Sequence, residues 1–186
     1  MILQRHWQKK TIEICGVFLL RAYLDGSDTH ARQKMHSASC LAGLAFNSAS
    51  LGLNHGMAHQ LGATFHIPHG RANAMLLPHI IEFNSDINKH SKSQAKYLPA
   101  VERYKTVARI LGLSSYNTIM TVRNLVNWVQ FMLKEMDIPL SVSQMGKISK
   151  EEYFAEIDAY GRSSAGGWMY SNESESAKQG RCHEDL

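Results

Sequence analysis

The chain has few of the features that mark disulfide-bonded, secreted or membrane-spanning proteins. Its 186 residues hold three cysteines, Cys15, Cys40 and Cys182, an odd number without a CxxC pair. A disulfide framework is therefore not expected, and a reducing cytoplasm is the default compartment. No apolar run reaches the roughly 18 residues of a membrane span. The basic start, MILQRHWQKK, is not followed by the apolar core of a signal peptide.

The chain is also only mildly basic. Charged residues make up 19% and the formal net charge is +4, with no block of Lys and Arg interleaved with aromatics. Because nucleic-acid-binding surfaces need such a patch, we expect neither a nucleic-acid nor a membrane partner. Hydrophobic residues make up 44%, enough for a packed core. The length suits one domain or a large part of one.

Strand signals are scarce, and apolar residues recur at intervals of three and four, the period of a helix. Turn residues such as Asp25-Gly26-Ser27 and Gly112 separate the apolar segments, and Asp28 or Thr29, Ser114 or Asn117, and Ser149 can cap the helices that follow. Polar residues 84–99 are typical of a loop, and after Tyr160 the periodicity disappears. The pattern predicts an all-α helical bundle with helices over residues 11–23, 31–50, 54–65, 71–83, 100–111, about 117–136 and a short one from 150.

Histidines gather in one part of this pattern. Five of the ten lie between His55 and His79, and His55 and His59 stand one helical turn apart on one face of a predicted helix. His69 follows after Pro68 turns the chain. Neutral imidazole is a good ligand for iron or zinc, so a helix face and a following turn can present nitrogens to one ion.

The alternative is that these histidines are structural, since pairs at this spacing also arise by chance. A zinc protease of the HExxH type is disfavoured because Gly56 stands where that motif needs its glutamate. We expect His66 and His79 to be structural or supporting residues. The remaining histidines of interest, His30, His36 and His90, are expected at the surface.

The surrounding sequence resembles a known family. Asn54-His55-Gly56-Met57-Ala58-His59, Ile67-Pro68-His69-Gly70 and Asn73-Ala74-Met75-Leu76-Leu77-Pro78-His79 closely resemble the helical C-terminal domain of the iron-containing alcohol dehydrogenases. Among these the chain is most similar to bacterial propanol, propanediol and ethanol dehydrogenases. The specific likeness covers residues 31–84, and a weaker one covers residues 11–158.

The resemblance implies distinct roles for the histidines. In that family one divalent ion, usually iron and sometimes zinc, is held by one Asp and three His. Carried over, His55 and His69 are metal ligands, and His59 lines the active site and relays the alcohol proton. The implied cofactors are Fe2+, or alternatively Zn2+, and NAD or NADP. The implied substrates are a small primary alcohol and its aldehyde.

The resemblance also leaves parts of the family pattern unmatched. The family's Asp and first His ligand lie upstream of the segment that matches Thr11, and no DxxxH precedes Thr11 here. The glycine-rich phosphate loop of the N-terminal nucleotide-binding domain has no counterpart either, so we expect that domain to be absent and half a metal site to remain. A homodimer, or a separate chain carrying the missing half, would be the partner.

Both ends of the chain depart from the family. A permitted back-translation of residues 160–172, read one nucleotide later, gives an Ala-rich helix followed by Cys-Thr and Asn-Pro, as family members have. Residues 1–9, read two nucleotides later, also give a family-like peptide. We therefore expect residues 1–10 to be a non-native leader, 11–158 the helical metal-binding domain and 159–186 a non-native tail. A divergent, disordered tail is the alternative, and the coding DNA distinguishes the two.

Two functions follow from the resemblance. The chain is expected to be a fragment of an NAD(P)-dependent, iron-dependent alcohol dehydrogenase, an oxidoreductase that transfers a hydride between a primary alcohol and its aldehyde. The alternative is an inactive remnant, a helical bundle with half a metal site and no catalysis of its own. On either view the separate chain is expected to be inactive.

Overall fold

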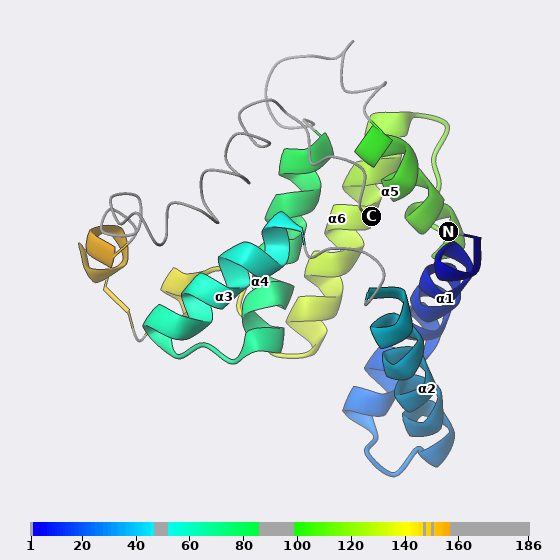
Figure 1. Cartoon of the computed structure of the whole chain (residues 1–186), viewed down its shortest axis with the longest axis horizontal. Helices are drawn as coiled ribbons and strands as arrows, with labels where there is room; N and C mark the ends of the chain where they lie inside the picture. Colours follow the sequence, from blue (N-terminus) through cyan, green and yellow to red (C-terminus); the bar gives the residue numbers. More distant parts are fainter. Residues whose placement is uncertain (1, 47–51, 86–98, 147, 150, 157–186) are drawn as a thin grey trace.

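The computed structural model describes residues 2–46, 52–85, 99–146, 148–149 and 151–156, and every regular element among them is helical (Figure 1). Residues 151–156 form a short helical segment after the named elements. The predicted all-α fold is confirmed for this part of the chain. The elements are α1 (Ile2–Leu24), α2 (Thr29–Phe46), α3 (Leu53–Phe65), α4 (His69–Ser85), α5 (Pro99–Ile110), α6 (Thr118–Glu135) and the 3-10 helix η2 (Val142–Met145).

The first helix begins earlier than the sequence pattern predicts. α1 runs without a break from Ile2, whereas periodicity gave a start at Thr11. Residues 2–10 contain no Gly or Pro, so nothing in them opposes the growth of the helix. Whether residues 1–10 are a non-native leader stays a prediction. The predicted end of the second helix and most of the predicted loop 84–99 lie outside the described residues, as does the predicted tail.

Side-chain caps fix where α2, α6 and the segment 151–156 begin. The Asp28 carboxylate accepts a hydrogen bond from Ala31 N at 2.9 Å, so Asp28 rather than Thr29 caps α2. The Asn117 side chain accepts from Ile119 N at 2.8 Å and Met120 N at 3.3 Å, which selects Asn117 over Ser114 for α6. Ser149 Oγ accepts from Glu152 N at 3.1 Å, as the predicted cap requires. Gly112, with φ of 73°, ends α5 where a left-handed backbone is needed.

The helices pack around two buried clusters that share α4. The larger cluster joins α4, α5 and α6, and its fully buried members include Val101 and Val122. The smaller joins α3, the turn after it and α4, and the side chains packed against it include Val142, Met145, Ile148 and Tyr153. α1 and α2 pair through an alanine face that includes Ala31, Ala38 and Ala45.

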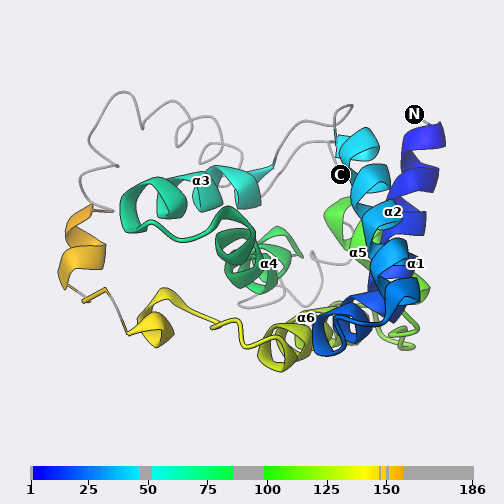
Figure 2. The same ribbon diagram turned by 90° about the horizontal axis from the view of Figure 1, so that it is seen from below.

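These contacts give an elongated arrangement (Figures 1 and 2). The α1–α2 pair lies at one end, α3 and the segment that reaches residue 156 lie at the other, and α4, α5 and α6 lie between them. α4 contacts α3, α5 and α6, while α1 meets the rest through α5. α4 therefore connects the two clusters. None of the helices in the described residues is both long and apolar enough to cross a membrane.

Leu125 provides a test of this packing. Its side chain is 2% exposed in the larger cluster, so Leu125→Ala removes buried methyl groups and leaves a cavity. We expect a loss of about 3 kcal/mol in the free energy of unfolding, measured by urea titration. Met120→Ala, on the same helix but 43% exposed, is the control and should change little. Equal effects of the two substitutions would contradict this packing.

Candidate metal centre

Three imidazole rings from two helices lie next to one another. His55 and His59 project from α3 with their ring centroids 6.3 Å apart. His69, the first residue of α4, lies 5.5 Å from the ring of His55 and stacks on His59 at 5.0 Å. The sequence motif thus places its three candidate residues in one cluster, which we call the histidine cluster.

The turn between α3 and α4 is what returns the chain to the histidines. His66 adopts a left-handed backbone, with φ of 53°, and ends α3. A methyl group at Gly62 would lie 3.2 Å from the Ile67 carbonyl oxygen, so the absence of a side chain there lets the turn approach the helix closely. Pro68 O then accepts from Ala72 N at 3.0 Å and starts α4. This reversal places His69 beside α3.

Small buried residues hold the two helices at close range. Ala58 of α3 and Ala72 of α4 are fully buried, and Leu61 and Ile67 complete the cluster between them. Because alanine side chains are short, helices that meet through them approach closely. The imidazoles of the two helices can therefore reach each other.

The surroundings of His55 favour its neutral form. Burial, followed by the nearby charges of His69 and His59 when these are protonated, lowers the pKa of the His55 imidazole below its usual value. Neutral imidazole has the lone pair that a metal ion needs. The ring of Phe46, at the end of α2, lies 6.0 Å from the His55 ring and covers part of it.

The cluster is not by itself a closed metal site. Within the described residues, no three His, Cys, Asp or Glu side chains are arranged to hold an ion together, although the three rings are neighbours. Stacking of His59 on His69 accounts for this, because stacked rings present their faces to each other and not their nitrogens. The donor set here fits part of a coordination sphere for iron or zinc.

Two asparagines beside the cluster were not predicted as site residues. Asn54 and Asn73 hydrogen-bond to each other across α3 and α4, and Asn73 also contacts His69. The Asn54 Oδ1 atom is buried and has no hydrogen-bond partner among the described residues. A buried unpaired acceptor costs about 1–3 kcal/mol. Both asparagines lie in the sequence motifs quoted above. The sequence did not mark them as site residues, because an asparagine near the start of a helix is usually interpreted as a helix cap.

The other histidines do not join the cluster. His79 Nε2 lies 3.3 Å from Leu140 O, which fits the structural role expected for it, and His66 forms the turn. His30 is exposed and stacks on Phe18 at 5.3 Å between centroids, and His36 is also exposed. His90 lies outside the described residues.

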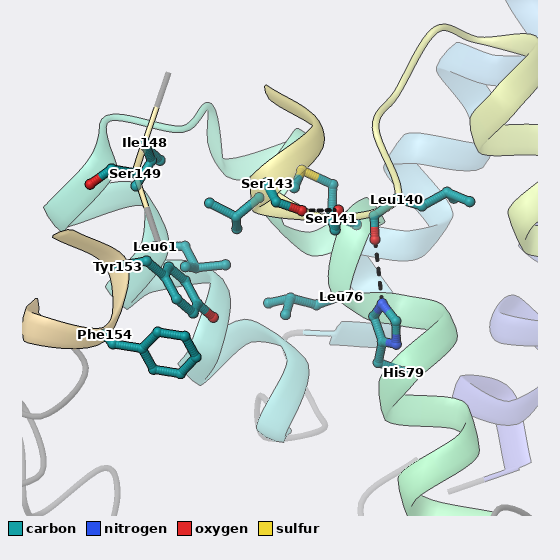
Figure 3. A pocket seen from close by; sticks show the side chains of 12 residues that line it. Leu61, Leu76, His79, Leu140, Ser141, Ser143, Ile148, Ser149, Tyr153 and Phe154 are labelled. Carbon is teal, nitrogen blue, oxygen red and sulfur yellow. Dashed lines mark hydrogen bonds between the residues drawn. The ribbon is translucent and has the colours of Figure 1, made fainter. Parts of the chain in front are cut away.

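A separate groove of about 430 Å³ lies between α3, α4 and residues 140–143, 148–149 and 153–154 (Figure 3). Leu61, Leu76 and Tyr153 line it, and His79 stands at one side of it. No member of the histidine cluster lines this groove. Its walls are mainly apolar, so the groove offers mostly packing surface.

Comparison with known proteins places this geometry in context. The chain is 38% identical over 149 residues to the NADPH-dependent butanol dehydrogenase of Clostridium saccharobutylicum. The aligned segment covers 80% of this chain and 34% of that protein. It is 35% identical over 153 residues to the 1-propanol dehydrogenase of Salmonella typhimurium, 81% of this chain and 38% of that protein. The chain thus spans between a third and two fifths of the length of these two relatives.

A solved structure shows the same fold. The alcohol dehydrogenase from Oenococcus oeni superimposes with a TM-score of 0.70 at 28% identity, over 93% of this chain and 39% of that one. The family model "Fe-containing alcohol dehydrogenase family, C-terminal" matches residues 4–162. Since this match includes the histidine cluster and most of the chain, the protein belongs to the Fe-containing alcohol dehydrogenase family.

Proposed function

We propose that this chain supplies the helical metal-binding part of an NAD(P)-dependent, iron-dependent alcohol dehydrogenase that interconverts a primary alcohol and its aldehyde. The single observation that carries the proposal is the meeting of His55, His59 and His69 inside the segment that matches the family. The names of the relatives, butanol dehydrogenase and 1-propanol dehydrogenase, support a small alcohol as substrate.

In this proposal His55 and His69 are the metal ligands contributed by the cluster. Their rings lie 5.5 Å apart and come from different helices, so a small rotation of each side chain can direct one nitrogen of each at a shared ion. Imidazole nitrogen suits both iron and zinc, and we propose iron because of the family. The resemblance implies two further ligands, an Asp and a His, which have no matching DxxxH motif before Thr11 in this chain.

His59 has a different role because it is exposed beside the proposed ligands. A histidine in this position can take the proton from an alcohol hydroxyl and pass it to solvent, because an imidazole nitrogen can both accept and donate a proton. When bound, the metal would supply Lewis acidity toward the alcohol oxygen and NAD(P) would accept the hydride. In the structure the His59 ring stacks on the His69 ring, with the two centroids 5.0 Å apart.

Metal titration tests the ligand assignment. We expect the full chain to bind Co2+ or Zn2+ in isothermal titration calorimetry, and His55→Ala and His69→Ala each to abolish measurable binding, because a single imidazole rarely holds a divalent ion. His36→Ala, at an exposed position on α2, should bind as the wild type does. Unchanged binding in His55→Ala would show that the ion is held elsewhere.

Activity distinguishes the proposed dehydrogenase from the inactive remnant. The test adds Fe2+, NAD+ or NADP+, and ethanol or 1-propanol to the chain and follows formation of the reduced nicotinamide. We expect turnover to require the parts of the relatives that lie beyond the matched segment, since this chain spans 34% of the butanol dehydrogenase. Fused to or mixed with such a segment, the wild type should turn over and His59→Ala should be slower by about 10²-fold or more. Equal turnover by both would remove His59 from the mechanism.

The protonation of His55 provides a pH test. Because its pKa is lowered in the folded chain, the folded state binds fewer protons than the unfolded state just below the ordinary pKa of histidine. Stability should therefore fall as pH drops through that range, and the His55 NMR titration should have a lower midpoint than in the urea-unfolded chain. His69→Ala removes a nearby positive charge and should raise that midpoint toward the ordinary value. A midpoint at or above the unfolded value would contradict the structure.

A further inference from the structure

We propose that Asn54 and Asn73 form a clamp between α3 and α4 that sets the separation of His55 and His69. In this proposal the two asparagines are positioning residues that act on the imidazoles and do not touch the reacting groups. The metal-directed part of the proposal rests on the function proposed above. The clamp itself is a property of the fold and can be tested without an ion.

The first half of the clamp joins the two helices directly. Asn54 Nδ2 donates to the Asn73 carbonyl oxygen at 3.2 Å and to Asn73 Oδ1 at 2.9 Å. Asn54 immediately precedes His55 in α3, and Asn73 lies one helical turn after His69 in α4. These two bonds therefore link the backbone next to one proposed ligand to the helix that carries the other.

The second half of the clamp holds the start of α4. Asn73 Nδ2 donates to the His69 carbonyl oxygen at 3.1 Å, which fixes the first turn of the helix. The same nitrogen lies 3.1 Å from Nε2 and 3.5 Å from Nδ1 of the His69 ring. If the amide nitrogen lay along the lone pair of one ring nitrogen, it would be much farther from the other ring nitrogen than it is here. The amide thus lies beside the ring, steadies it and leaves its lone pairs available.

The chemistry of the amide explains why asparagine suits both positions. An amide has two N–H donors and an acceptor oxygen, so the Asn73 side chain can accept a bond from Asn54 at Oδ1 while it donates to His69. The Asn54 Oδ1 atom is buried and has no hydrogen-bond partner among the described residues. Burial of an unpaired polar atom is unfavourable, so packing alone does not explain an asparagine at this position. Histidine ligands in metal sites are regularly held by neighbours of this kind, and loss of such a neighbour typically lowers metal affinity.

The clamp can be tested without metal by NMR. In the wild type we expect the side-chain amide protons of Asn54 and Asn73 to exchange with water more slowly than those of Asn127, which is exposed on α6. We also expect cross-relaxation between ring protons of His55 and His69. Asn54→Leu keeps the side-chain volume but removes the donors, and it should weaken that cross-relaxation. Asn127→Leu is the matched control and should leave it unchanged. Exchange of the Asn54 amide as fast as that of Asn127 would overturn the proposal.

Metal affinity tests the consequence for the site. Asn54→Leu should bind Co2+ about 10-fold or more weakly than the wild type, although the hydrogen bonds of Asn54 within the described residues go to Asn73 and not to a histidine ring. Circular dichroism confirms that the variant is folded, and Asn127→Leu should bind as the wild type does. A folded Asn54→Leu variant with wild-type affinity and unchanged ring cross-relaxation refutes the clamp. Absence of Co2+ binding in the wild type refutes the proposed function instead, and the NMR comparison then decides the clamp alone.

Discussion

The close contact between α3 and α4 is the constraint on which the candidate site depends. Fully buried Ala58 and Ala72 let the two helices approach closely, and Leu61 and Ile67 exclude water from the contact. Without this approach, His69 would not come within 5.0 to 5.5 Å of the rings on α3. The left-handed His66 and the bare backbone at Gly62 make the reversal between the helices possible.

α4 connects the histidine cluster to the rest of the molecule. Its first turn supplies His69, and its later part contributes Ile81 to the larger cluster with α5 and α6. The site is therefore attached to the part of the fold with the most buried apolar surface. Because the interior of such a cluster is close-packed, movement of α4 would disturb both clusters at once. The Asn54–Asn73 clamp adds a polar link at the end of α4 that lies nearest the histidines.

The chemistry of the cluster agrees with its family. Neutral imidazoles on two helices are suited to iron or zinc, and the lowered pKa of His55 favours the form that binds metal. If His69 binds a metal ion as proposed, its ring must rotate out of the stacked arrangement with His59. The fold thus brings the proposed ligands His55 and His69 near each other.

Much of this protein could be predicted from its sequence, because the signals involved are local. Apolar spacing gave the helical class, and Ser149 and Gly112 marked a helix start and a helix end, since capping depends on residues a few positions apart. Between Ser114 and Asn117 the structure selected Asn117. The motif from Asn54 to His69 named the three histidines, and its likeness to the iron-containing alcohol dehydrogenases gave the family. The start of α1 was predicted wrongly, because periodicity is weak in residues 2–10 and the helix has no breaker there.

Only the tertiary structure decided how the histidines stand toward one another. Helical spacing places His55 and His59 on one face, but the stacking of His59 on His69 depends on where the turn returns the chain. The link from Asn54 to Asn73 likewise joins residues 19 positions apart, beyond the reach of any helical period. The sequence by itself determined which residues have ligand chemistry, because that chemistry belongs to each side chain. Their distances and partners required the packing of α3 on α4, because a contact between helices depends on both surfaces together.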